Sequence, residues 1–141
     1  MLDAVRAHAP SLVRALPAHV SLLYPGPPPE AVAEVTRLTS ALPPVVTCEE
    51  ILTGEDGFVG LAVPELDPVL ARLRDAFPRA TPYGGRYGEA PAAHVTLALG
   101  ARADEITALV RDLLPVRSEV VGPLFVENTA TGWRPVSAPP P

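Results

Sequence analysis

The spacing of apolar and polar residues divides the chain into alternating helices and strands. Apolar residues that recur every three or four positions predict helices, and short apolar runs with branched residues predict strands. Pro10 should shorten or kink the first helix, and Asp67 followed by Pro68 should cap the third. Helices are expected over 2–16, 28–42, 67–77 and 104–114, and strands over 18–24, 45–53, 58–63, 93–99, 116–127 and 133–136. The Gly-Glu-Asp-Gly run 54–57 predicts a turn that joins strands 45–53 and 58–63.

The two halves of this pattern match. A His-Val-Ser-Leu tetrad over 19–22 and a His-Val-Thr-Leu tetrad over 94–97 each lead into a helix, a strand and a hairpin. The 75-residue offset is too long for a solenoid repeat. The pattern predicts an α+β fold of duplicated α-β-α-β-β units, related by a pseudo-two-fold axis, with antiparallel sheets lining a central cleft. Lobes 1–64 and 65–137 would form one domain, and the Pro-rich residues 138–141 a disordered tail.

One strand has no counterpart in this duplication. Strand 58–63 leads into the helix that opens the second half, and the corresponding strand of the first half would lie before Met1. Either the chain starts late, which leaves one sheet a strand short, or its start is misplaced. A sheet that is one strand short exposes unpaired backbone groups, which favours pairing with another chain. The protein is therefore expected to be a monomer, or a dimer joined through this sheet edge.

Composition limits the possible partners. The 141 residues are typical of one domain, and the net charge of −5 excludes a general nucleic-acid-coating surface. All eleven basic residues are arginines, so a few of them can still hold a small anionic ligand. No apolar run is long enough for a membrane helix and no signal peptide is evident, so a cytoplasmic protein is expected. Cys48 is the single cysteine, and its strand-like surroundings predict a buried, inert thiol.

The tetrads carry the candidate chemistry. Residues i and i+2 of a strand share a face, so His19 lies with Ser21 and His94 with Thr96, while the valines between them point into the core. A neutral imidazole can take a proton from an attacking hydroxyl or water while a charged one protonates the leaving oxygen, each worth ~10²–10⁴-fold. The two hydroxyls can donate to the phosphate oxygens. No metal or cofactor is required. A single histidine on a strand is usually a core residue, but two equivalent tetrads favour catalysis; His8 lacks this context.

These motifs resemble those of the 2H phosphoesterase superfamily, in its bacterial 2'-5' RNA ligase-like branch. The resemblance runs from residues 17–25 through the loop 82–89 to residues 132–134. It implies a bilobal α+β fold and metal-independent chemistry on a 2',3'-cyclic phosphate or a 2'-5' phosphodiester of a nucleotide or RNA end. It implies that His19 and His94 are the acid/base pair and that Ser21 and Thr96 bind the phosphate. The likeness favours His94 as the base, and hydrolysis versus ligation stays open.

Weaker candidates for substrate binding surround these motifs. Tyrosine rings can stack on a base and arginine can contact a phosphate, which suggests roles for Tyr24, Tyr83, Arg86, Tyr87 and Arg134. Two alternatives remain: the scaffold serves a different biosynthetic reaction, or it binds nucleotides or RNA ends without catalysis.

Overall fold

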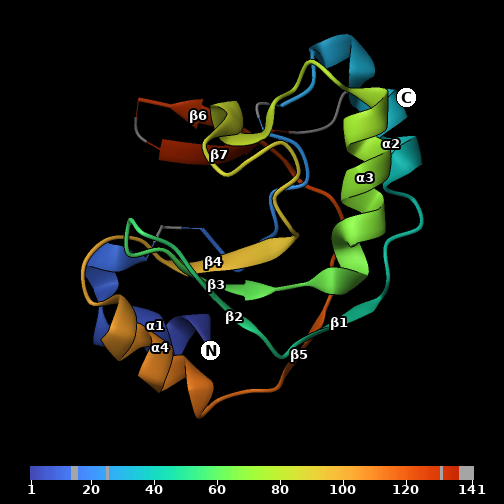
Figure 1. Cartoon of the computed structure of the whole chain (residues 1–141). Coiled ribbons are helices and arrows are strands. Elements are labelled where there is room, and N and C mark those ends of the chain that lie inside the picture. The colour runs from blue at the N-terminus through green and yellow to red at the C-terminus, as the bar shows by residue number, and fades with distance from the viewer. Residues whose placement is uncertain (14–15, 25, 131, 137–141) are drawn as a thin grey trace.

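The computed structural model describes residues 1–13, 16–24, 26–130 and 132–136 and has a mixed α+β fold (Figure 1). Short 3₁₀ turns lie at Pro10–Leu12, Pro29–Ala31, Pro64–Leu66 and Pro82–Gly85. The helices are α1 (Leu2–His8), α2 (Val32–Leu38), α3 (Asp67–Ala76) and α4 (Ala103–Arg111). The strands are β1 (Val45–Cys48), β2 (Ile51–Thr53), β3 (Val59–Ala62), β4 (His94–Ala98), β5 (Val116–Glu119), β6 (Phe125–Thr129) and β7 (Gly132–Val136).

The strands pair antiparallel in three small sheets. The central sheet has the order β2-β3-β4, β1 pairs with β5, and β6 pairs with β7. An isolated antiparallel bridge joins Val20 to Val95 of β4. The 18–24 segment therefore lies along the side of β4 opposite to β3, because β3 already occupies the other side.

Two apolar clusters hold these layers together. The larger is formed mainly by α1, α4 and the central sheet, where Val5, Val59, Ile106 and Val110 are fully buried. The smaller joins α2 to α3, which lie side by side in Figure 1. Leu22 packs against both clusters, so the segment that carries the first tetrad lies between them.

The helices begin and end close to the predicted places, with three corrections. α1 ends at His8 and a 3₁₀ turn follows from Pro10, as expected of a residue without a backbone N–H; residues 14–15 lie outside the described part. The helix expected over 28–42 is confined to α2, because prolines precede it and Thr39 ends it. The prediction that Asp67 is the N-cap of α3 is wrong. Leu66 holds the N-cap position and no side chain caps the helix, because the Asp67 carboxylate accepts instead from the N–H of Ala93.

Three predicted strands are wrong in their extent. The run 18–24 forms one bridge instead of a strand. The run 45–53 breaks at the exposed residues Glu49 and Glu50, because β1 pairs with β5 whereas β2 pairs with β3. The run 116–127 divides into β5 and β6, because Gly122 has φ +124° and Pro123 follows it. The predicted hairpin turn 54–57 is confirmed between β2 and β3.

The duplicated units, the central cleft, the lobe boundaries and dimerisation through a sheet edge remain predictions. The tail 138–141 lies outside the described residues. Cys48 is buried as predicted, and burial, together with the nearby Glu65 carboxylate, raises the pKa of its thiol. None of the helices that the structure describes combines the length and apolar character needed to cross a membrane.

Candidate functional site

The two tetrads lie side by side and antiparallel. The bridge between Val20 and Val95 sets the register. Continued by one residue in each direction, this register places His19 opposite Thr96 and Ser21 opposite His94. Directly opposite side chains have Cβ atoms ~4.5–5.5 Å apart and diagonal ones ~7–8 Å. All four therefore share one face, and the two histidines form the diagonal pair.

The other face of this strand pair is apolar, as the sequence predicted. Val20 and Val95 both pack against the larger core cluster. Since successive side chains point to opposite faces, burial of the valines leaves the histidines and hydroxyls on the accessible face. His19, His94 and Thr96 are half-buried and Ser21 is exposed.

Both imidazole rings are oriented by the same kind of hydrogen bond. Nδ1 of His19 lies 2.8 Å from the carbonyl oxygen of Pro17, and Nδ1 of His94 lies 2.8 Å from that of Ala92. A carbonyl only accepts, so Nδ1 carries the proton in each ring. In the neutral ring Nε2 is then the unprotonated nitrogen, which can accept a proton or, once charged, return it.

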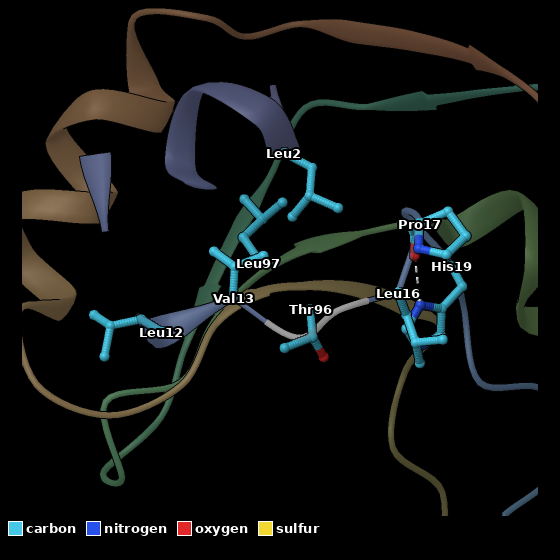
Figure 2. A pocket seen from close by; sticks show the side chains of 8 residues that line it. All are labelled: Leu2, Leu12, Val13, Leu16, Pro17, His19, Thr96 and Leu97. Atoms are coloured by element: carbon cyan, nitrogen blue, oxygen red, sulfur yellow. Dashed lines mark hydrogen bonds between the residues drawn. The ribbon is translucent and has the colours of Figure 1, made fainter. Parts of the chain in front are cut away.

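Two hollows open beside the four side chains. Each is lined by one of the two opposite pairs, His19 with Thr96 or Ser21 with His94. The first, in Figure 2, is lined by His19 and Thr96 together with apolar side chains of α1, the following turn and β4. Its apolar lining residues are Leu2, Leu12, Val13, Leu16, Pro17 and Leu97. The second is lined by Ser21 and His94, with Tyr24, Tyr83 and Arg74 beside them. The site is thus asymmetric: apolar beside His19, aromatic and cationic beside His94.

The tyrosines predicted to bind substrate gather on the His94 side. The ring centroid of Tyr83 lies 5.7 Å from that of Tyr24, 5.4 Å from that of Tyr87 and 6.3 Å from that of His94. Tyr83 has φ +52°, which is rare for a residue with a side chain. Its backbone N–H donates to the carbonyl of Tyr24, so the loop is tied to the first tetrad's segment.

Trp133 extends this cluster, a position that the sequence analysis did not assign to the site. Its ring centroid lies 6.0 Å from that of Tyr24, edge to face. It comes from β7, in the C-terminal hairpin. Aromatic side chains at a surface can stack on a nucleobase, and Tyr24 in this cluster is exposed while Tyr83 and Trp133 are half-buried.

Phe58 is a second neighbour of His94 that the sequence did not reveal. Its ring stands edge-on to the imidazole, with centroids 5.2 Å apart and planes at 83°. It lies over Gly60 of β3, where an added Cβ would be 2.5 Å from the Phe58 ring and 2.9 Å from the Val95 carbonyl oxygen. Glycine at this position is the only signal in the sequence, because it marks a close approach.

The two arginines predicted as weak substrate contacts are both held by carboxylates. Arg86 is exposed, forms an ion pair with Asp56 and lies 5.6 Å from the centre of the Tyr87 ring. Arg134 pairs with Glu127, its cross-strand neighbour in the β6–β7 hairpin. Arg86 remains next to the aromatic cluster, whereas the contacts that Arg134 makes with the described residues do not include the histidines.

Arg74 is a further cation at the site, and the sequence did not predict it as a substrate-binding residue. It is half-buried on α3, lines the hollow with His94 and Ser21, and donates through Nη2 to the carbonyl of Pro91. It forms no ion pair among the described residues. Its spacing from the second tetrad gave no sign of this contact, because 16 residues of loop intervene between α3 and Ala93.

The fold and the site define an α+β protein that presents two His-x-Ser/Thr motifs from adjoining antiparallel segments. A family model for the 2'-5' RNA ligase superfamily matches residues 2–122, which is most of the chain. The chain therefore belongs to this superfamily, the 2H phosphoesterases. The match includes both tetrads and ends before β6. No curated protein matches the sequence significantly.

Proposed function

We propose that the chain is a metal-independent phosphoesterase acting on a 2',3'-cyclic phosphate or a 2'-5' phosphodiester of a nucleotide or RNA end. The observation that carries the proposal is the antiparallel bridge between Val20 and Val95. Continued by one residue on each side, its register would put both histidines and both hydroxyls on one face. A diagonal separation of ~7–8 Å between their Cβ atoms leaves room for one phosphate between the imidazole rings.

The proposed hydrolysis is a single displacement at phosphorus. Nε2 of one neutral histidine takes a proton from water as the water oxygen bonds to phosphorus. The bond from phosphorus to the 2' or 3' oxygen breaks, and the second, charged histidine protonates that oxygen. The product is a phosphomonoester with one free ribose hydroxyl, and the same steps in reverse form a phosphodiester.

The hydroxyls of Ser21 and Thr96 would donate to the non-bridging phosphate oxygens as negative charge develops. One positioned donor of this kind is worth on the order of 3 kcal/mol. Since each hydroxyl stands opposite the histidine of the other tetrad, each half of the site would pair one proton-transfer group with one phosphate ligand.

The pseudo-two-fold duplication belongs to the same proposal. Val20 and Val95 hold equivalent places in the two tetrads and pair with each other. β1 and β5, which follow equivalent helices, also pair antiparallel with each other. Pairing between equivalent strands is what a two-fold axis between two halves would produce, and this supports a shared site at that axis.

The aromatic cluster supports a nucleoside substrate. Tyr24, Tyr83 and Trp133 offer a stacking surface beside His94, and each stacked base is worth ~1–3 kcal/mol. We place the base on this side and the apolar hollow next to His19 on the other side of the phosphate.

The test is turnover of the four 2',3'-cyclic nucleotides and of 2'-5' dinucleotides in EDTA, with product regiochemistry determined by chromatography. His8→Ala is the matched control, because His8 lies on α1 and bonds to Glu105 instead of facing the tetrads. Turnover that survives EDTA and His8→Ala supports the proposal. Tight product binding without turnover would instead indicate a nucleotide or RNA-end binder, and inactivity on every such substrate would indicate a scaffold recruited to another reaction.

A further inference from the structure

The segment that leads into His94 is fixed by hydrogen bonds at consecutive backbone groups. Arg74 donates to the carbonyl of Pro91, and the Ala93 carbonyl accepts from the N–H of Val63 at 2.8 Å. The Ala93 N–H donates to Oδ1 of Asp67 at 2.8 Å. Ala93 itself is 1% exposed, and the hydrogen bonds from Arg74 to Pro91 and from Ala93 to Asp67 are part-buried.

One peptide group links Asp67 to the imidazole. The carbonyl of Ala92 and the N–H of Ala93 belong to the same planar peptide bond. Asp67 accepts from its N–H end, and Nδ1 of His94 donates to its carbonyl end. The order is carboxylate, peptide, imidazole, and hydrogen bonds in such a chain polarise and strengthen one another.

Asp67 is exposed, but it lies on an anchored helix. It is the first residue of α3, whose Val69, Leu70 and Leu73 are buried in the two core clusters. The Asp67 carboxylate makes no hydrogen bond that caps α3. The side chain thus ties the start of an anchored helix to the peptide that orients His94.

Among the described residues, Asp3 at the matching place of the other half makes no such link. Asp3 follows Leu2 as Asp67 follows Leu66, but its side chain is 96% exposed and pairs with Arg6 at 2.9 Å. Arg6 in turn donates to the carbonyl of Leu16 at 3.2 Å, three residues before His19. Asp3 therefore provides a matched control for Asp67 within the same chain.

We propose that Asp67 is a positioning residue for His94, acting through the Ala92–Ala93 peptide. It fixes the Nδ1–H tautomer and the ring plane, which leaves Nε2 of the neutral ring as the nitrogen that can take a proton. The proposal rests on the proposed function, because it assigns a role in the same acid/base step.

The test compares Asp67→Ala, Asp67→Asn and Asp3→Ala in the full chain. Asp67→Ala should lower kcat on the order of 10–100-fold with KM little changed, because misplacing a catalytic group by about 1 Å costs up to ~10²-fold. In Asp67→Asn the amide oxygen can still accept from Ala93, so kcat should recover by about tenfold over the alanine variant. Asp3→Ala should keep the wild-type kcat.

A second readout does not depend on activity. Nitrogen-15 spectra of the histidine rings should give the Nδ1–H tautomer for His94 in the wild type and a mixture of tautomers in Asp67→Ala, with His19 unchanged. In Asp67→Asn, whose amide oxygen can still accept from the Ala93 N–H, His94 should keep the Nδ1–H tautomer.

The two proposals fail in different ways. If no cyclic phosphate is hydrolysed but the His94 tautomer follows Asp67, the phosphoesterase assignment falls and the positioning role stands. An Asp67→Ala protein that folds with wild-type kcat and an unchanged His94 tautomer overturns the positioning role. So does an Asp67→Asn protein whose His94 shows the same mixture of tautomers as Asp67→Ala.

Discussion

Gly60 leaves the space that lets Phe58 lie against His94, and filling that space should impair stability and activity together. A Cβ at position 60 would lie 2.5 Å from Cζ of Phe58 and 2.9 Å from the backbone oxygen of Val95. Ordinary contacts between such atoms are ~3.5–4.0 Å, so the ring would have to retreat by about 1 Å. The Val95 oxygen belongs to β4 and cannot retreat without moving the strand that carries His94 and Thr96.

We expect Gly60→Ala to lower the free energy of unfolding by ~1–3 kcal/mol, the usual cost of overpacking a well-packed site. The centroid of the Phe58 ring lies 5.2 Å from that of the His94 imidazole. Displacing the Phe58 ring therefore removes a packing contact that holds the imidazole in place. A misplacement of about 1 Å can lower kcat up to ~10²-fold. Urea unfolding and steady-state kinetics on a 2',3'-cyclic nucleotide measure the two effects separately.

Gly26→Ala is the matched control, since a Cβ there meets nothing within 4 Å. In a Phe58→Ala background the ring is absent but the contact with the Val95 oxygen remains, so Gly60→Ala should cost less stability than in the wild type without becoming neutral. The reasoning is refuted if Gly60→Ala unfolds at the wild-type urea concentration and keeps the wild-type kcat.

Three further predictions concern the aromatic cluster, the thiol and a surface ion pair. The single tryptophan, Trp133, should change its fluorescence when a nucleotide binds, and Tyr24→Leu should raise KM by about 5–150-fold, the equivalent of ~1–3 kcal/mol of stacking; an unchanged KM contradicts the stacking role. Cys48 should react slowly with thiol reagents in the native protein and rapidly in denaturant, because burial raises its pKa; rapid native labelling contradicts this. Hydrogen bonds from Arg102 and His8 lower the pKa of Glu105 from 4.5 to about 2. The stabilisation from Glu105 is therefore present above pH 4.5 and lost as the pH falls toward 2. Melting curves should show Glu105→Gln less stable than wild type at pH 7 and equal to it near pH 2, and equal stability at pH 7 would contradict this.

Local patterns predicted the elements that depend on neighbouring residues. Pro10 ended α1, and the Gly54–Gly57 turn formed its hairpin, because each effect arises within a few residues of chain. The placement of Val20 and Val95 in the core followed from the two-residue period of strands. The two-residue period of strands also made the two His-x-Ser/Thr motifs recognisable, because it sets the histidine and the hydroxyl of each motif on the same face.

Features that depend on distant pairing were not predictable. The division of 45–53 follows from a change of partner, from β5 to β3, which no local pattern encodes. Asp before Pro is typical of an N-cap, and this local pattern predicted that role for Asp67. Its carboxylate instead accepts a hydrogen bond from the N–H of Ala93, 26 residues away. Phe58 and Trp133 looked like ordinary apolar residues, and only the fold brings them to the site.

The central claim is that His19 and His94 act on one phosphorus in the same step. The most direct test is kcat/KM on a 2',3'-cyclic nucleotide for His19→Ala, His94→Ala and the double variant. Each single variant should lose at least ~10²-fold, and the double variant should be little worse than either, because residues that act as a unit are not additive. Wild-type activity in either single variant, or a double variant whose loss is the product of the two single losses, would contradict it.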